Sequence, residues 1–404
     1  MSRKTAYCSA LLPLVCGALL VVPASAQHSA NPANSQDAKS TAFRGIGSPV
    51  VSDPTKAQAI LDYWSPDRLS NARPLPIPTL DKEAIDAAAA KVPVNGPSGG
   101  SPGGRPSIQA EPTEETQTET FPLNQGDADE SAPSDPPGFN YVYPYNNFRT
   151  GVNNTYPYST VGKLFFIVPS GATLPPGEYV CTASVAMNSY TLVTSRQCMY
   201  DVNTGKWYGS FVFYPGWNSG KNSKLGGAWT VRYAWTWPTG YANYYYDIGF
   251  LALNDHNGQG CDNSTGSKSI GHYTGWLGNW YGEDYSQVQW SLFGYPTTSP
   301  FNGNYLYQDN AATAALNPFG YSGTVAVGNP QAGGITGGPW VLGFDPNNAS
   351  SSVPVDNINA NKNLINSVIS YKSASYPLMV VGPEFESNNF SNLYGGYLAN
   401  NGCN

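Results

Sequence analysis

Short runs of Val, Ile, Tyr, Phe and Trp, separated by Gly, Asn and Pro turns, fill this chain from about residue 138 to its end. These residue types are enriched in strands, and the runs are short for helices. We expect strands at 163–168, 179–187, 190–195, 207–214, 229–237, 248–253, 288–294, 340–344 and 378–381, with one weak helix near 361–368. So many short strands indicate an all-β sandwich or barrel, and two barrels suit the length better than one.

The charge balance excludes one class of partner. The formal net charge is -7, and charged residues make up only 12% of the chain, without a basic patch. Nucleic-acid binding requires such a patch, so we expect no nucleic-acid partner. Aromatic residues reach 13%, which is typical of an exported, loop-rich β protein.

The first 26 residues have the three parts of a secretory signal peptide. A basic start with Arg3 and Lys4 precedes an apolar run at 10–22, and the small residues Ala24-Ser25-Ala26 follow. A membrane anchor is the alternative, but the run is shorter than the ~20 residues that a bilayer needs and contains Pro13. We therefore expect a secreted protein with no membrane span.

Residues 27–137 differ in composition from the rest of the chain. They are rich in Ser, Pro, Ala, Asp and Glu, and such a segment buries too little apolar surface to offset chain entropy. We interpret them as a largely disordered prosegment or linker, with order expected only at 59–64 and in an Ala-rich helix at 81–92. The folded domain is expected at 138–404.

Four cysteines remain after removal of the signal peptide: Cys181, Cys198, Cys261 and Cys403. In an oxidising compartment they indicate two disulfides, with three pairings open. A zinc site is the competing interpretation. The chain has no CxxC pair and only three histidines, so we expect no metal and no cofactor.

Three segments of the folded part occur in an informative order. Cys-Thr-Ala-Ser at 181–184 leads to Leu-Val-Thr-Ser-Arg-Gln-Cys at 192–198, then Tyr-Asp-Ile-Gly-Phe-Leu lies at 246–251 and Gly-Gly-Ile-Thr-Gly-Gly-Pro-Trp at 333–340. Over about 138–404 the chain resembles the chymotrypsin/trypsin-like serine proteases, and among them the glutamyl-endopeptidase-like branch. The resemblance implies two six-stranded Greek-key β-barrels, at about 138–253 and 254–404, with the site between them.

The resemblance places the catalytic triad at Gln197, Asp247 and Thr336, of which only Asp247 matches the family. A histidine serves as general base because its pKa lies near neutrality, whereas an amide can donate to Asp247 but cannot take the nucleophile's proton. A mid-chain threonine lacks the amino terminus that activates catalytic threonines, and its methyl group crowds the attack. Arg196, next to Gln197, is a candidate counter-charge for Asp247.

The resemblance also assigns supporting positions. The N–H groups of Gly334 and Thr336 correspond to an oxyanion-like nest, and Ser370 with Tyr371 corresponds to the substrate cleft. Ile335 stands where zymogens carry an acidic residue. The branch's pocket disulfide aligns with Gln308 and Asn329, so that bridge is absent.

The family's bridge beside the histidine loop corresponds to Cys181–Cys198, which leaves Cys261 to pair with Cys403.

The sequence therefore predicts a secreted protease homologue without proteolytic activity, which binds a peptide or protein in the old substrate cleft. One alternative is an active endopeptidase with an altered catalytic set, in which His256 or His272 is recruited from a neighbouring loop. Another is a carbohydrate- or cell-surface-binding protein that uses exposed Tyr and Trp. The oligomeric state is left open.

Overall fold

The computed structural model describes residues 45–50, 53–80, 96–108, 145–151, 153–219, 225–241, 243–256, 261, 268–318, 322–347, 362–374 and 376–403. The expected signal peptide and the expected helix at 81–92 lie outside these ranges. No helix within them is both long enough and apolar enough to span a bilayer.

Six strands close into an antiparallel β-barrel, the first of the two that were expected. Around the barrel they pair in the order β12-β11-β6-β7-β8-β13, and β13 pairs back to β12. Their bounds are β6 (Val161–Val168), β7 (Gly177–Val185), β8 (Thr191–Thr194), β11 (Gly209–Pro215), β12 (Trp229–Thr236) and β13 (Gly249–Leu253). In β6, Leu164 and Phe166 face the barrel core, whereas Phe165 between them belongs to a second core cluster, as the two-residue repeat of a strand requires.

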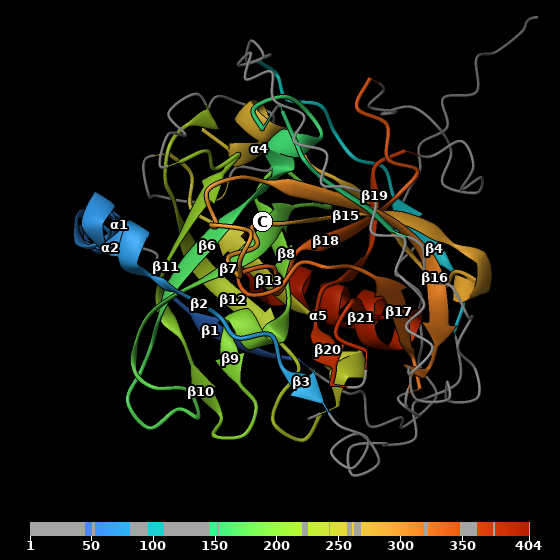
Figure 1. Ribbon diagram of the computed structural model, residues 1–404. Helices are drawn as coiled ribbons and strands as arrows, with labels where there is room; N and C mark the ends of the chain where they lie inside the picture. The colour runs from blue at the N-terminus through green and yellow to red at the C-terminus, as the bar shows by residue number, and fades with distance from the viewer. Residues whose placement is uncertain are drawn as a thin grey trace, which may run out of the picture. The chain divides into compact units, whose positions relative to one another are not determined.

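The second sheet has the strand order β3-β20-β21-β17-β16-β15-β18-β19-β14-β4 (Figure 1). Its main strands are β14 (Gly278–Tyr281), β15 (Gln289–Gly294), β16 (Tyr307–Leu316), β17 (Thr324–Gly328), β18 (Pro339–Leu342), β19 (Leu364–Val368), β20 (Tyr371–Ser373) and β21 (Met379–Pro383). Leu292, Val327 and Trp340 are buried in its core. The expected all-β class with a trypsin-like double barrel is confirmed.

In each half of the domain, one element comes from the part of the sequence that forms the other half. β5 (Tyr145–Arg149) precedes the first barrel in sequence, where it was expected to belong, yet it pairs with β16 of the second sheet. Helix α5 (Asn392–Asn400) ends the chain, and the hydroxyls of its Tyr397 and of Thr191 in β8 are hydrogen-bonded at 2.9 Å. These exchanges tie the two sheets into one domain.

The weak helix expected near 361–368 is wrong, because residues 364–368 form strand β19 between β18 and β14. The shorter elements complete the description: α4 (Ile270–Thr274), the β9 (Tyr200–Asp201) and β10 (Lys206–Trp207) ladder, a π-helical turn (Ser387–Ser391), and the 3₁₀ turns η1 (Tyr158–Thr160), η2 (Arg196–Cys198), η4 (Tyr244–Tyr246) and η5 (Tyr285–Gln287).

Residues 27–137 were expected to be largely disordered, with order at 59–64. The described parts of that region, 59–64 among them, are folded. They form β1 (Ile46–Pro49), α1 (Pro54–Tyr63), α2 (Pro66–Asn71), β2 (Arg73–Pro74), β3 (Thr79–Leu80) and β4 (Gly99–Ser101). The strands β1 and β2 pair with the first barrel, and β3 and β4 pair with the second sheet. After α1, Trp64 is 2% exposed, its indole N–H donates to the carbonyl of Ser210 at 2.7 Å, and its ring packs on Phe165. This region folds despite its low apolar content because a few large apolar side chains, such as Trp64, are buried against the barrels.

Both expected disulfides are present, Cys181–Cys198 and Cys261–Cys403. The first joins β7 to η2, and the second ties the end of the chain to a residue 142 positions earlier. Each restricts the unfolded chain, which contributes roughly 2–4 kcal/mol to stability.

Candidate active site

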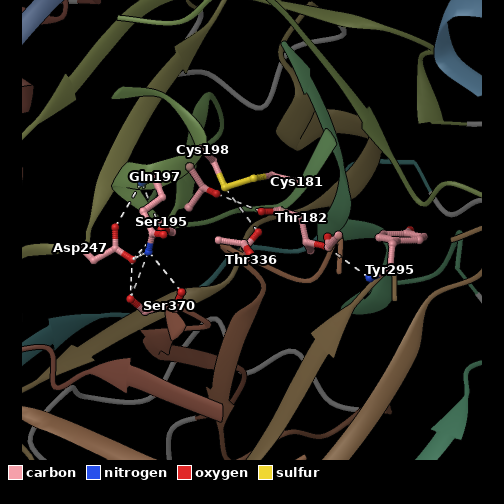
Figure 2. Close-up of a disulfide and its surroundings, with 11 residues drawn as sticks. Cys181, Thr182, Ser195, Gln197, Cys198, Asp247, Tyr295, Thr336 and Ser370 are labelled. Carbon is pink, nitrogen blue, oxygen red and sulfur yellow. Dashed lines mark hydrogen bonds between the residues drawn. A yellow bond between two sulfur atoms is a disulfide. The ribbon is translucent and has the colours of Figure 1, made fainter. Parts of the chain in front are cut away.

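Asp247 is the centre of a buried hydrogen-bond cluster. It lies between η4 and β13 and has no exposed surface. Its carboxylate accepts hydrogen bonds from Ser195 Oγ at 2.6 Å, from the Gln197 backbone N–H at 3.2 Å, from Gln197 Nε2 at 2.6 Å and from Ser370 Oγ (Figure 2). Four donor groups from two segments, the Ser195–Gln197 turn and Ser370, satisfy the buried carboxylate.

Gln197 is held in place by the turn that carries it. Ser195 caps η2, and its Oγ accepts from the Gln197 N–H at 3.2 Å. The side-chain Nε2 donates to Asp247 and also to the carbonyl of Ser370 at 3.1 Å. Because both partners are acceptors, the amide nitrogen must face them, and the amide has no basic site to offer a nucleophile. Gln197 therefore donates a hydrogen bond to the carboxylate, as a triad histidine does, but it cannot accept a proton from the nucleophile.

Arg196 does not neutralise Asp247 by contact. Its guanidinium donates to the carbonyls of Tyr241 at 2.5 Å and Asn243 at 3.4 Å, and the side chain is 2% exposed. Burial lowers the pKa of Arg196, and the negative charge of Asp247 opposes that shift. Arg196 acts on Asp247 through space and fixes the loop that leads into η4.

Thr336 lies in a glycine-framed loop that is fastened to β7. Gly333, Gly334 and Gly337 have φ values of 60°, 72° and 83°, a region that L side chains rarely adopt. The Thr182 N–H donates to the Thr336 carbonyl at 3.0 Å, and Thr182 Oγ1 donates to the Gly334 carbonyl at 2.8 Å. One β7 residue thus holds both halves of the loop.

The Thr336 hydroxyl is buried and unpaired. Thr336 has no exposed surface, and its Oγ1 has no hydrogen-bond partner within the described part of the chain. A nucleophile must be bonded to its base to lose its proton to it. The described residues contain Asp247 and Gln197 in contact, but they lack the link from Gln197 to Thr336.

Ile335 shows how the loop stays in place without an acidic residue. Its side chain is fully buried in the core cluster of the second sheet, which also contains Trp340. A Cβ atom added to Gly294 of β15 would lie 2.7 Å from Ile335 Cγ2, so the contact is close. Apolar burial holds the loop where an ion pair would do so in a zymogen-type switch.

The other assigned positions are also enclosed. Ser370 and Tyr371 have no exposed surface, and the Tyr371 ring packs on Tyr244 with centroids 4.6 Å apart. Their assignment to the substrate cleft stays a prediction; Ser370 Oγ donates to Asp247, and Tyr371 is buried. The backbone N–H groups of Gly334 and Thr336 stay a predicted oxyanion-like nest.

The positions aligned with the missing pocket bridge carry polar contacts. Gln308 Nε2 donates to Ser291 Oγ and Asn310 Oδ1, and Asn329 Oδ1 accepts from the Gln331 N–H.

Two histidines were candidates for recruitment. His256 stacks on Trp229 at 4.4 Å and meets Tyr273 edge-on, and His272 also contacts Tyr273 edge-on. These ring contacts belong to the surroundings of β12 and α4, and the Asp247 donors described above include no imidazole. No group of three or more His, Cys, Asp or Glu suited to a metal ion occurs among the described residues.

Sequence reasoning missed two residues of the site, Ser195 and Thr182. Both lie in the segments that carried the resemblance, but small hydroxyl residues in strand-rich segments are too common to signal a role. Only the fold shows that one caps the Gln197 turn and binds Asp247, and that the other fastens the Thr336 loop.

Asp247→Asn should destabilise the protein by about 2–3 kcal/mol, because the new amide turns an N–H₂ group toward donors that then lack an acceptor. Asp62→Asn is the matched control, since Asp62 is exposed and accepts a hydrogen bond from Gln58 on the same helix. Urea unfolding should show a change below about 0.5 kcal/mol for the control. Equal effects for the two variants would contradict the satisfied-charge description.

No protein-family model and no curated protein sequence matches this chain. Solved structures do. The thermostable serine protease AL20 from an extremophilic microorganism is 24% identical, with 60% of this chain and 98% of that chain covered and a TM-score of 0.48. Protease Anisep from Arthrobacter nicotinovorans is 24% identical, with 61% and 99% covered and a TM-score of 0.45. A Glu endopeptidase is 13% identical, with 62% and 96% covered and a TM-score of 0.44.

The fold assignment rests on the closed six-stranded barrel, on the second sheet, and on the contacts that join the Gln197 segment to Asp247 and to Thr336. The protein has the double-barrel fold of the chymotrypsin-like serine proteases, and the assignment of Gln197 and Thr336 to two of the three triad positions stays a prediction.

Proposed function

We propose that this protein is a secreted homologue of trypsin-like serine proteases that does not hydrolyse peptides and instead binds an extended polypeptide between its two barrels. The observation that carries the proposal is the division of the triad. Gln197 Nε2 is committed to Asp247, while Thr336 Oγ1 lacks a partner in the described part of the chain. Asp247 thus has a hydrogen-bond partner at the histidine position, whereas no described residue is bonded to the Thr336 hydroxyl to act as its base.

Loss of base and nucleophile together removes most of the rate enhancement, because a triad acts as a unit. The hydrogen bonds that the Asp247 carboxylate accepts and the one that Thr182 Oγ1 donates to the glycine-framed loop are nonetheless present. Retention of the framework without the proton-transfer groups supports a role in binding.

Secretion is part of the same proposal. It is supported by the signal-like first 26 residues and by two disulfides, which persist in oxidising compartments.

The two alternatives have weaker support. An active endopeptidase needs a general base near Thr336. The two candidate histidines, His256 and His272, instead pack against Tyr273 of α4. Binding of carbohydrate through aromatic rings needs exposed ones, and none of the tryptophans, all of which the structure describes, is exposed.

Casein and fluorogenic peptides test the proposed lack of activity. Purified protein should hydrolyse both no faster than its Thr336→Ala variant, prepared in the same way. That variant keeps any co-purifying protease and loses only the hydroxyl. Turnover that is present in the wild-type protein and disappears in Thr336→Ala would show that Thr336 is a working nucleophile.

A further inference from the structure

Residues 73–80, called the strap below, join the two barrels at the residual triad. The strap begins with β2, which pairs with β7 of the first barrel, and ends with β3, which pairs with β20 of the second sheet (Figure 1). Both pairings are parallel, so the strap runs in one direction from one sheet to the other. It adds a strand to an edge of each.

The first end of the strap is anchored in the first barrel. Leu75 is 2% exposed and packs with the core cluster that contains Cys181, and its N–H donates to the Val180 carbonyl at 2.9 Å. The Arg73 guanidinium lies over the Tyr179 ring, 4.3 Å from its centroid. This anchorage combines a buried side chain with strand pairing.

The second end is anchored in the second sheet. The N–H groups of Lys372 and Ala374 donate to the carbonyls of Pro78 and Leu80 at 2.8 and 2.9 Å. Ile77 packs against the core cluster that contains Ile335, next to Thr336. The strap thereby reaches the glycine-framed loop from its apolar side.

The two strands that hold the strap are the ones that build the site. β7 carries Thr182, which fastens the Thr336 loop, and β20 follows directly on Ser370, which binds Asp247. At its β2 end, Pro74 approaches the loop: a Cβ atom added to Gly333 or Gly334 would lie 3.8 Å from Pro74 Cβ. The strap therefore passes over the place where the proposed function requires a polypeptide to bind.

The strap's sequence suits this position. Prolines occupy positions 74, 76 and 78, so every second residue has a fixed φ, and the residues before Pro76 and Pro78 are held extended. Leu75 and Ile77 point inward between them, while Pro76 is exposed. A chain that is extended before it docks loses less conformational entropy on binding.

We propose that the strap is an internal ligand of a strand-addition groove formed by the edges of β7 and β20, and that it keeps this groove closed. The groove takes an extended polypeptide with apolar residues at alternate positions, as the strap presents Leu75 and Ile77. This inference rests on the proposed function, because it states how the peptide-binding site of that proposal is occupied and regulated.

The covalent link makes the strap a strong competitor. A tethered segment acts at an effective concentration in the millimolar range, whereas a free peptide binds only to the fraction of molecules whose groove is open. Weakening one anchor raises that fraction, and the apparent affinity for a free peptide rises by the same factor.

The test uses a fluorescein-labelled peptide with the sequence of residues 72–80 and the full-length protein. Ile77→Asp weakens the strap at a half-buried anchor, and Leu75→Asp is a second, independent variant at the other end. Thr79→Asp is the matched control, because it adds the same charge at an exposed strap position. Binding is measured by fluorescence anisotropy, with competition by an unlabelled peptide that carries Asp at both anchor positions.

Hydrogen exchange provides a second measurement with an internal control. The N–H groups of Lys372 and Ala374 are protected by the strap, whereas the Ser370 N–H donates to the Val381 carbonyl within the second sheet. Opening of the strap should accelerate exchange at the first two and leave Ser370 unchanged. Unfolding of the domain would accelerate all three.

We expect Ile77→Asp to bind the labelled peptide at least about tenfold more tightly than the wild-type protein and Thr79→Asp do, with faster exchange at Lys372 and Ala374. Equal binding by all of the proteins would overturn the closing role of the strap and leave peptide binding intact. Accelerated exchange in both anchor variants without peptide binding would overturn the groove, and the proposed binding function with it.

Discussion

Gln197→His combined with Thr336→Ser should turn this protein from one without measurable esterase activity into one that hydrolyses a small activated ester at ~10² times its wild-type background or faster. Gln197 Nε2 donates to Asp247 at 2.6 Å, so the carboxylate is in position to orient a histidine at residue 197. The loop around position 336 is fastened by Thr182, and a serine removes the crowding methyl group. Hydrolysis of p-nitrophenyl acetate gives the measurement.

Each single substitution is the control for the double one. Gln197→His alone leaves a crowded nucleophile, and Thr336→Ser alone leaves a serine without a base, so both should stay near the background. Because Thr336 is fully buried, the gain should increase when Ile77→Asp is added to open the strap. A folded triple variant with no gain would mean that the predicted oxyanion-like nest at Gly334 and Thr336 is not formed.

Gly337→Ala should have the largest effect on stability, a loss of about 3–5 kcal/mol. Gly337 has a φ of 83°, and a Cβ atom there would lie 2.0 Å from Thr194 Oγ1, 2.5 Å from the Thr182 carbonyl and 2.9 Å from the Ser195 N–H. Two of these three neighbours are backbone atoms, one in β7 and one in the residue that caps the Gln197 turn, so they have little freedom to move. The loop and the Gln197 turn therefore require a glycine between them.

Gly227→Ala is the matched control, because Gly227 has a φ of 76° and a Cβ atom there meets no described atom within 4 Å. Its loss should be about 1–2 kcal/mol, from the left-handed backbone alone. Urea unfolding of both variants separates strain from overlap. Similar losses for the two would show that the Thr336 loop does not press on the first barrel.

The all-β class and every one of the nine expected strands follow from the sequence, because alternating apolar residues between turns are a local signal. The elements that were missed depend on tertiary contacts. In β16, the Ala-rich stretch at 311–316 has helical propensity, but pairing with both β15 and β17 makes it a strand. In α5, Gly395 and Gly396 conceal a helix that forms because Leu393 and Tyr397 are buried.

The candidate site shows the same division. Gln197 and Asp247 were assigned to one site from motif order, and Gln197 Nε2 donates to Asp247 at 2.6 Å. The strap could not be found in this way, because a Pro-rich stretch within 27–137 has the composition of a linker. Its order comes from strand edges supplied by residues about 100 and 300 positions later, and no local pattern records such pairing.

The most direct test of the central claim is the intact mass of the protein after reaction with a fluorophosphonate, measured for the wild-type protein and for Ile77→Asp, in which the strap is opened. A hydroxyl without a base does not attack the reagent. We predict that neither mass changes, while the Gln197→His/Thr336→Ser variant gains one adduct at position 336. A stoichiometric adduct on Thr336 of the wild-type protein, absent from Thr336→Ala, would contradict the account.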